Sequence, residues 1–181
     1  VDDLVKTELA FLQAQIKPHF IFNALSVISS LSTRNPEKAK ELILDLSDYL
    51  RGSLDVESHN SLTTLKKELG LVKAYLAIEQ ARFKDRLNVS FDIECDRDCE
   101  IPILSLQPLV ENAVRHGIMP LPKGGEICVS IRDEGESIRI SVSDNGAGID
   151  EEKIQKLLRG EEMKKGSVGL KNINRRLIAL Y

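Results

Sequence analysis

The chain has 181 residues, a formal net charge of −3 and 42% hydrophobic residues, which is typical of a globular protein with one ordinary domain or two small ones. Its lysines and arginines are spread along the sequence, so we expect no DNA or RNA partner. No apolar run approaches the roughly 20 residues of a membrane span. The three cysteines, Cys95, Cys99 and Cys128, have no neighbouring histidine to complete a zinc site, which predicts reduced structural thiols.

A long amphipathic helix is predicted from Val5 to about residues 32–34, because apolar residues follow steps of four and three at Val5, Leu9, Leu12, Ile16 and Phe20. Asn35 followed by Pro36 is typical of a helix start. A second helix is therefore predicted from Pro36, with an apolar stripe at Ala39, Leu42, Ile43, Leu46, Tyr49 and Leu50. The short connection makes the two helices antiparallel neighbours.

Two helices cannot enclose a core on their own. We therefore expect two copies of the chain to form a four-helix bundle, and hence a homodimer through the N-terminal helices. The alternative is that a helix from the rest of the chain covers the apolar stripe.

Residues 52–60 are polar and predict a loop. Helical spacing returns from Ser61 to Arg82, which we interpret as a connecting helix. After Asn88 the hydrophobic period changes to two, and the alternation of Val89, Phe91 and Ile93 with polar residues predicts a strand buried on one face.

A helix from Ser105 to His116 is expected to stop at Gly117, because glycine often takes the left-handed conformation after a helix. After a loop over residues 120–125, apolar residues alternate over 127–131 and again over 138–142, which predicts a hairpin. A closing helix is predicted over 168–181. The fold class is α+β, with dimerisation helices at 1–60, a connecting helix at 61–86 and a domain with a largely antiparallel sheet at 87–181.

The stretch from Gln15 to Asn23 places a proline and a histidine inside the first predicted helix. Pro18 removes the hydrogen bond to the carbonyl of Ala14, at a cost of roughly 3 kcal/mol. The imidazole of His19 can act as a nucleophile, so we expect chemistry at His19 and a hinge at Pro18. Asn23 lies one helical turn later on the same face, where its amide could orient a water molecule.

Polar groups also gather at three places further along the chain. Asn112 and His116 share a face of their predicted helix, and an amide oxygen is a suitable ligand for Mg²⁺. Asp144 begins a glycine-rich loop, where a fixed carboxylate could accept a hydrogen bond from an amine of a base. Residues 166–169 begin a helix, whose free N–H groups suit phosphate. Taken singly, each place is also compatible with an ordinary surface helix or turn.

In this order, the three places resemble the ATP-binding α/β sandwich shared by histidine kinases, DNA gyrase, Hsp90 and MutL. The resemblance is carried by Glu111-Asn112-Ala113 with His116, by Asp144-Asn145-Gly146-Ala147-Gly148, and by Ser167-Val168-Gly169-Leu170. It implies that Asn112 holds Mg²⁺, that Asp144 receives the adenine amine, and that residues 148–167 form a mobile lid over the phosphates. The nucleotide-binding residues implied in this way are Asn112, His116, Asp144, Gly146, Gly148, Lys165, Ser167, Gly169 and Leu170.

The stretch Gln15-x-x-Pro18-His19-Phe20-x-Phe22-Asn23 resembles the phosphoacceptor motif of the LytS-like sensor histidine kinases. Tyr75-Leu76-x-Ile78-Glu79 and Gln107-Pro108-Leu109-Val110-Glu111-Asn112 resemble the same family. The resemblance implies ATP-dependent phosphorylation of His19 and transfer of the phosphoryl group to an aspartate of a response regulator, with phosphatase activity as a further function. From its spacing on the helix, Asn23 is our candidate for assisting removal of the phosphate.

Two features depart from the family pattern. Many histidine kinases carry an acidic residue directly after the histidine, whereas Phe20 stands here, so Glu111 becomes our candidate base. Ser167 stands where the family has a glycine. The family continues into further strands beyond Tyr181, so we expect this chain to be a piece of a longer protein. The resemblance implies that the upstream part is a membrane-embedded sensor and that this chain is the cytoplasmic portion.

Two alternative functions remain open at this point. One is an ATPase of the gyrase, Hsp90 or MutL type, in which water takes the place of His19 as the acceptor. The other is a non-catalytic scaffold that dimerises and binds nucleotide poorly because of Ser167.

Overall fold

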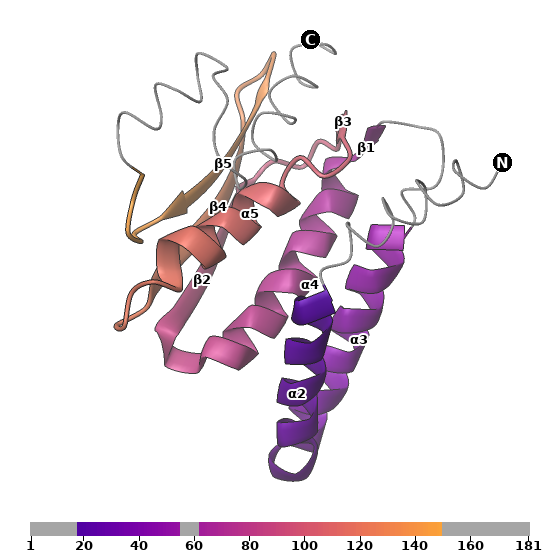
Figure 1. The fold of residues 1–181 in the computed structure, drawn as a ribbon. Helices are drawn as coiled ribbons and strands as arrows, with labels where there is room; N and C mark the ends of the chain where they lie inside the picture. Colours follow the sequence, from indigo (N-terminus) through magenta and orange to yellow (C-terminus); the bar gives the residue numbers. More distant parts are fainter. Residues whose placement is uncertain (1–17, 55–61, 150–181) are drawn as a thin grey trace, which may run out of the picture. The chain divides into compact units, whose positions relative to one another are not determined.

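The computed structural model describes residues 18–54 and 62–149 of the chain (Figure 1). The start of the first predicted helix, the predicted closing helix and nearly all of the predicted lid lie outside these residues. The chain forms two compact units, one of Val1–Asn60 with Lys73–Lys84 and one of Ser61–Val72 with Asp85–Tyr181. In the described ranges, no helix combines the length and apolar character needed to cross a membrane.

The first unit contains α2 (Pro18–Arg34) and α3 (Pro36–Leu54), which lie side by side and are connected through Asn35 (Figure 1). The side-chain oxygen of Asn35 accepts a hydrogen bond from the backbone N–H of Lys38 over 3.1 Å, which is the geometry of a helix N-cap. The predicted start of the second helix at Pro36 is therefore confirmed.

The predicted loop from residue 52 is wrong in its first part, because α3 continues through Gly52 to Leu54. Ser53 is buried and lies one turn after the buried Tyr49. The helix therefore continues past Gly52 despite the poor helix propensity of glycine.

Three aromatic rings form the centre of the helical unit. The ring centroids of Phe20 and Tyr49 lie 4.7 Å apart, and those of Phe20 and Tyr75 lie 5.0 Å apart. Tyr75 belongs to α4 (Leu65–Phe83), of which the residues from Lys73 onward are part of this unit. Around Phe20 and Tyr49, the apolar surface of the first two helices is therefore covered by α4 of the same chain. This agrees with the alternative to a four-helix bundle that the sequence left open.

The second unit contains two sheets. In the smaller one, β1 (Leu62–Thr64) pairs antiparallel with β3 (Glu100–Pro102). The predicted helix from Ser61 is wrong here, because the first described residues are a strand and α4 begins only at Leu65. Three-residue strands carry almost no periodic signal, and the partner of β1 lies far along the sequence.

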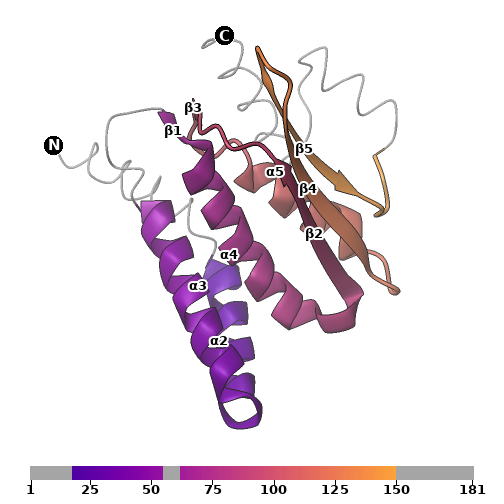
Figure 2. The same cartoon turned by 180° about the vertical axis from the view of Figure 1, so that it is seen from behind.

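The larger sheet has the strand order β2-β4-β5, formed by β2 (Leu87–Glu94), β4 (Gly125–Asp133) and β5 (Ile138–Asp144) (Figure 2). The β4–β5 pair is antiparallel, so the predicted hairpin is confirmed, whereas β2 runs parallel to β4. The second unit therefore mixes helices with a mixed sheet, which confirms the predicted α+β class.

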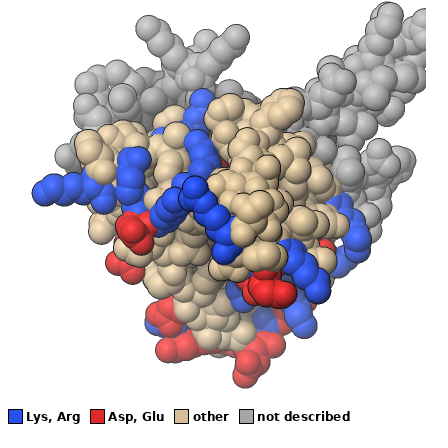
Figure 3. Space-filling model, turned by 90° about the horizontal axis from the view of Figure 1, so that it is seen from below, with Lys and Arg blue, Asp and Glu red and all other residues tan. Residues whose placement is uncertain are grey.

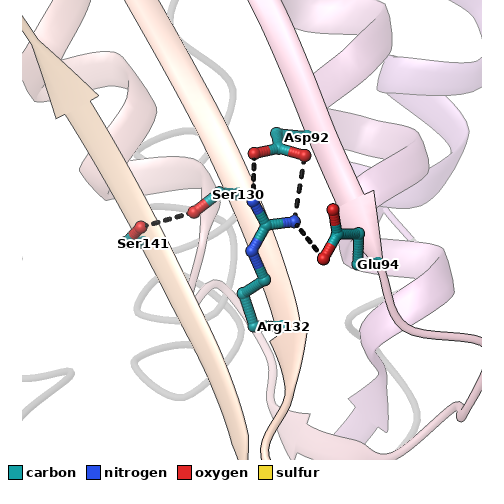
Figure 4. Close-up of polar contacts among 5 residues, drawn as sticks. All are labelled: Asp92, Glu94, Ser130, Arg132 and Ser141. Atoms are coloured by element: carbon teal, nitrogen blue, oxygen red, sulfur yellow. Dashed lines mark hydrogen bonds and ion pairs between the residues drawn. The ribbon is translucent and has the colours of Figure 1, made fainter.

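The two faces of the larger sheet differ in polarity. Ile127, Val129 and Ile131 of β4 are buried on one face. On the other face, Arg132 donates to Asp92 and forms an ion pair of 3.0 Å with Glu94, while the hydroxyls of Ser130 and Ser141 lie 2.7 Å apart (Figure 4). These contacts connect β4 to both of its neighbours. Acidic and basic side chains both occur among the described residues on the face shown in Figure 3.

Candidate functional site

The helix with the Glu111-Asn112 pair has an irregular geometry. It begins as α5 (Gln107–Asn112) and continues as a π-helical segment, η3 (Ala113–Ile118). Asn112 is half-buried at the end of α5, and His116 is exposed on η3. Single π-helical turns are frequently found at functional sites.

The predicted stop at Gly117 is wrong, because the helical segment includes Gly117 and ends at Ile118. Gly117 is not among the glycines with a positive φ angle, which are Gly124, Gly135 and Gly148 in the described part of the chain. A Cβ atom at Gly117 would lie 2.5 Å from Oδ1 of Asp144. Glycine is therefore favoured here by the close approach of the Asp144 side chain and not by backbone conformation.

The loop after β5 packs directly against η3. A Cβ atom at Gly146 would lie 2.3 Å from the carbonyl carbon of Gly117. The backbone N–H of Ala147 donates a hydrogen bond to the carbonyl oxygen of Gly117 over 2.9 Å. The structure thus brings together two motifs that lie some thirty residues apart in the sequence, and Gly117 is a site residue that sequence reasoning missed.

Asp144 is the last residue of β5, and its carboxylate is exposed. Its Oδ1 accepts a hydrogen bond from the backbone N–H of Gly146 over 2.9 Å, which orients the carboxylate within the loop. The next residue, Asn145, fixes the loop to β4, because its Oδ1 accepts the backbone N–H of Glu126 over 2.7 Å. Sequence reasoning missed this role of Asn145, although an asparagine in a glycine-rich turn is a known signal for such bonds.

Glu111 is buried and accepts a hydrogen bond on Oε1 from Nε2 of Gln107 over 3.1 Å. This contact fixes the orientation of the carboxylate that the sequence suggested as a base. Among the described residues, no three His, Cys, Asp or Glu side chains are grouped to hold a metal ion. Lys165, Ser167, Gly169 and Leu170 lie outside the described residues.

His19 lies in the first described turn of the helical unit, and its side chain is exposed. The side-chain nitrogen Nδ2 of Asn23 lies 3.1 Å from Nδ1 of the imidazole. The two side chains therefore share one helix face, as their spacing predicted. The next residue, Phe20, is buried in the aromatic centre, so one side of this turn is anchored while the imidazole faces solvent.

Two family models match the chain. Residues 7–87 match the family described as histidine kinase, and residues 102–181 match the histidine kinase-, DNA gyrase B- and HSP90-like ATPase family. Together the two models cover most of the chain. The first contains His19 and Asn23, and the second contains Asn112 and Asp144. The chain therefore belongs to the histidine kinase family and combines a histidine kinase module with an ATPase module.

Curated relatives match nearly the whole chain. It is 45% identical to the sensor histidine kinase YpdA of Escherichia coli, with 97% of this chain and 31% of YpdA covered. It is 44% identical to YwpD of Bacillus subtilis, with 95% of this chain and 62% of YwpD covered. It is 41% identical to the sensor histidine kinase/phosphatase LytS of Staphylococcus aureus, with 98% of this chain and 31% of LytS covered. The chain thus spans about a third of the length of YpdA and LytS.

Proposed function

We propose that the chain catalyses ATP-dependent phosphorylation of His19 and passes the phosphoryl group to an aspartate of a response regulator. The observation that carries this proposal is the exposed imidazole of His19, which is hydrogen-bonded to Asn23. The helix turn that presents it is held in place by the buried side chain of Phe20. The same chain contains a domain of the ATPase family. By similarity to LytS, which is named a kinase and phosphatase, dephosphorylation is a second activity of the same chain.

The contact between His19 and Asn23 supports a defined tautomer of the imidazole. The amide nitrogen Nδ2 of Asn23 is a donor and lies 3.1 Å from Nδ1 of His19, so Nδ1 accepts and the proton of the neutral ring lies on Nε2. Nε2 loses this proton to the base as it forms the bond to phosphorus, and the bond between the γ-phosphorus and the leaving ADP oxygen breaks.

The residues of the second unit fit a nucleotide with Mg²⁺. The exposed and oriented carboxylate of Asp144 suits the amine of adenine, and the amide oxygen of Asn112 suits a hard cation. Mg²⁺, when bound, neutralises phosphate charge during transfer. Glu111, oriented by Gln107, is our proposed base for His19. His116, Gly146, Gly148, Lys165, Ser167, Gly169 and Leu170 are the further nucleotide contacts that we propose.

We also propose that the helical unit forms a homodimer. Large apolar side chains are exposed on both of its first two helices, namely Phe22, Leu25, Ile43 and Leu44. Exposed apolar surface of this kind on a helical hairpin is suited to pairing with a second copy in a four-helix bundle. The longer sensor kinases among the relatives favour a membrane-anchored parent protein, with this chain on the cytoplasmic side.

One experiment separates this function from the two alternatives. Nucleotide binding, phosphate release and acid-labile labelling from γ-labelled ATP are measured on the same preparation. A kinase binds nucleotide and becomes labelled. An ATPase of the gyrase type releases phosphate without becoming labelled, and a scaffold does neither. Absence of labelling in a preparation that binds ATP would overturn the proposed function.

A further inference from the structure

A buried carboxylate outside the proposed site contacts the segment from which α5 begins. Glu68 lies in the first turn of α4 and is 2% exposed. A charged side chain is almost never buried this deeply unless it has partners. Glu68 belongs to the same unit as α5 and the Asp144 loop.

The partners of Glu68 are backbone N–H groups. Its Oε1 accepts from Leu104 over 2.7 Å, and its Oε2 accepts from Leu106 over 3.1 Å. Hydrogen bonds from the backbone of Ser105 and Gln107 also lower the pKa of Glu68, against the larger effect of burial, which raises the pKa. Four consecutive amides thus converge on one carboxylate, as in the backbone concavities that bind anions.

The residues directly before α5 supply no side-chain cap for the start of this helix. The residue before α5 is Leu106, whose side chain makes no cap hydrogen bond. Leu104 has a φ of 56°, a conformation that a bulky residue rarely adopts. Such strain persists only where the surroundings enforce it. The carboxylate of Glu68 binds the N–H of this same residue and holds the turn in place.

A chain of contacts leads from this turn to the proposed site. Gln107, the first residue of α5, donates to Glu111, which directly precedes Asn112. The η3 segment that follows packs against the Asp144 loop through Gly117. A displacement at the start of α5 would therefore move the residues proposed to hold Mg²⁺ and adenine.

We infer that Glu68 is a positioning residue for the nucleotide site: its carboxylate fixes residues 104–107 and so sets the affinity for ATP without touching it. This inference rests on the proposed function, because it presumes that the second unit binds ATP. The Glu68→Gln variant keeps the size of the side chain but replaces one acceptor oxygen with an NH₂ group, which cannot accept from the backbone.

The test measures the Kd for ATP with Mg²⁺ on the whole chain, together with hydrogen exchange of individual amides. We expect Glu68→Gln to raise the Kd at least about tenfold, the factor that corresponds to 1.4 kcal/mol, and to speed exchange at residues 104–107 while β4 stays protected. Glu136→Gln is the matched control, because Glu136 is exposed in the hairpin turn of the same unit. This variant should leave both measurements unchanged.

Each other outcome has a defined meaning. An unchanged Kd in Glu68→Gln overturns the inference while the proposed function stands. Loss of protection in β4 along with residues 104–107 also overturns it, because Glu68 would then support the whole unit and not the site. If the unaltered chain binds no ATP, it is the proposed function that fails.

Discussion

The backbone N–H of Ala147 donates a hydrogen bond to the carbonyl oxygen of Gly117 over 2.9 Å. This bond joins the helical segment after Asn112 to the loop after Asp144. A Cβ atom at Gly146 would collide with the backbone of Gly117, and one at Gly117 would collide with the side chain of Asp144. The two halves of the proposed nucleotide site are therefore positioned by one close backbone contact.

Gly117→Ala tests this contact. The added methyl group would lie 2.5 Å from Oδ1 of Asp144, so the carboxylate must move. We expect the Kd for ATP to rise about tenfold or more, since losing one charge-assisted hydrogen bond costs about 1.5–3 kcal/mol. The control is Gly70→Ala, where a Cβ atom would meet nothing within 4 Å. Equal affinities in the two variants would contradict the proposed role of Gly117.

Phe20 and Phe22 form a matched pair on α2. Phe20 is 5% exposed and Phe22 is 69% exposed. We expect Phe20→Ala to lower the free energy of unfolding by about 3 kcal/mol at every protein concentration, as for other buried aromatic side chains. Phe22→Ala should act only at concentrations where the proposed dimer forms. Urea unfolding at several concentrations, with sedimentation, measures both. A concentration-independent effect of Phe22→Ala would contradict the dimer face.

Asn23→Ala separates the two proposed activities of His19. We expect labelling of His19 to stay within about fivefold, because an exposed hydrogen bond contributes only about 1 kcal/mol. Removal of the phosphoryl group should slow by roughly a hundredfold, the typical loss when a group that assists water is deleted. The measurement is the decay of labelled protein, with Ser29→Ala as the control on the exposed surface of α2. An unchanged decay rate would remove Asn23 from the dephosphorylation step.

We expect the stability of the fold to depend on pH through Glu68. Burial raises the pKa of Glu68 in the folded state above the ordinary value of 4.5, which applies to the unfolded state. Between the unfolded and the folded pKa, the folded state therefore binds more protons than the unfolded state. Stability from this residue is complete below the unfolded pKa and is lost as the pH rises through the folded pKa. We therefore expect the free energy of unfolding, relative to Glu68→Gln, to fall as the pH rises above about 4.5. Parallel pH profiles in urea unfolding would contradict this.

Local sequence signals predicted much of the fold. Asn35 and Pro36 predicted a helix start, and Asn35 is the N-cap of α3. The alternation of apolar and polar residues on either side of residues 133–136 predicted the hairpin. The site motifs were visible because glycines and fixed carboxylates cluster in short segments. What escaped prediction depends on contacts distant in sequence. The β1–β3 pair and the cap from Glu68 join segments more than thirty residues apart.

Gly117 shows a second limit of sequence reasoning. A glycine after an amphipathic helix usually signals a left-handed end, but here the absent Cβ makes room for Asp144. A glycine that ends a helix and a glycine that makes room for a neighbouring side chain look the same in the sequence. Only the position of the neighbouring loop distinguishes them. Gly52 is similar, because α3 continues through it to Leu54 although glycine is a poor helix former.

The most direct test of the central claim compares the unaltered chain with His19→Ala in acid-labile labelling from γ-labelled ATP, with the Kd for ATP measured on both. His19 lies in the first unit and the proposed nucleotide site in the second, so the substitution should leave the Kd unchanged. We predict that labelling is abolished in His19→Ala. Labelling that persists at the level of the unaltered chain would contradict the assignment of His19 as the phosphoacceptor.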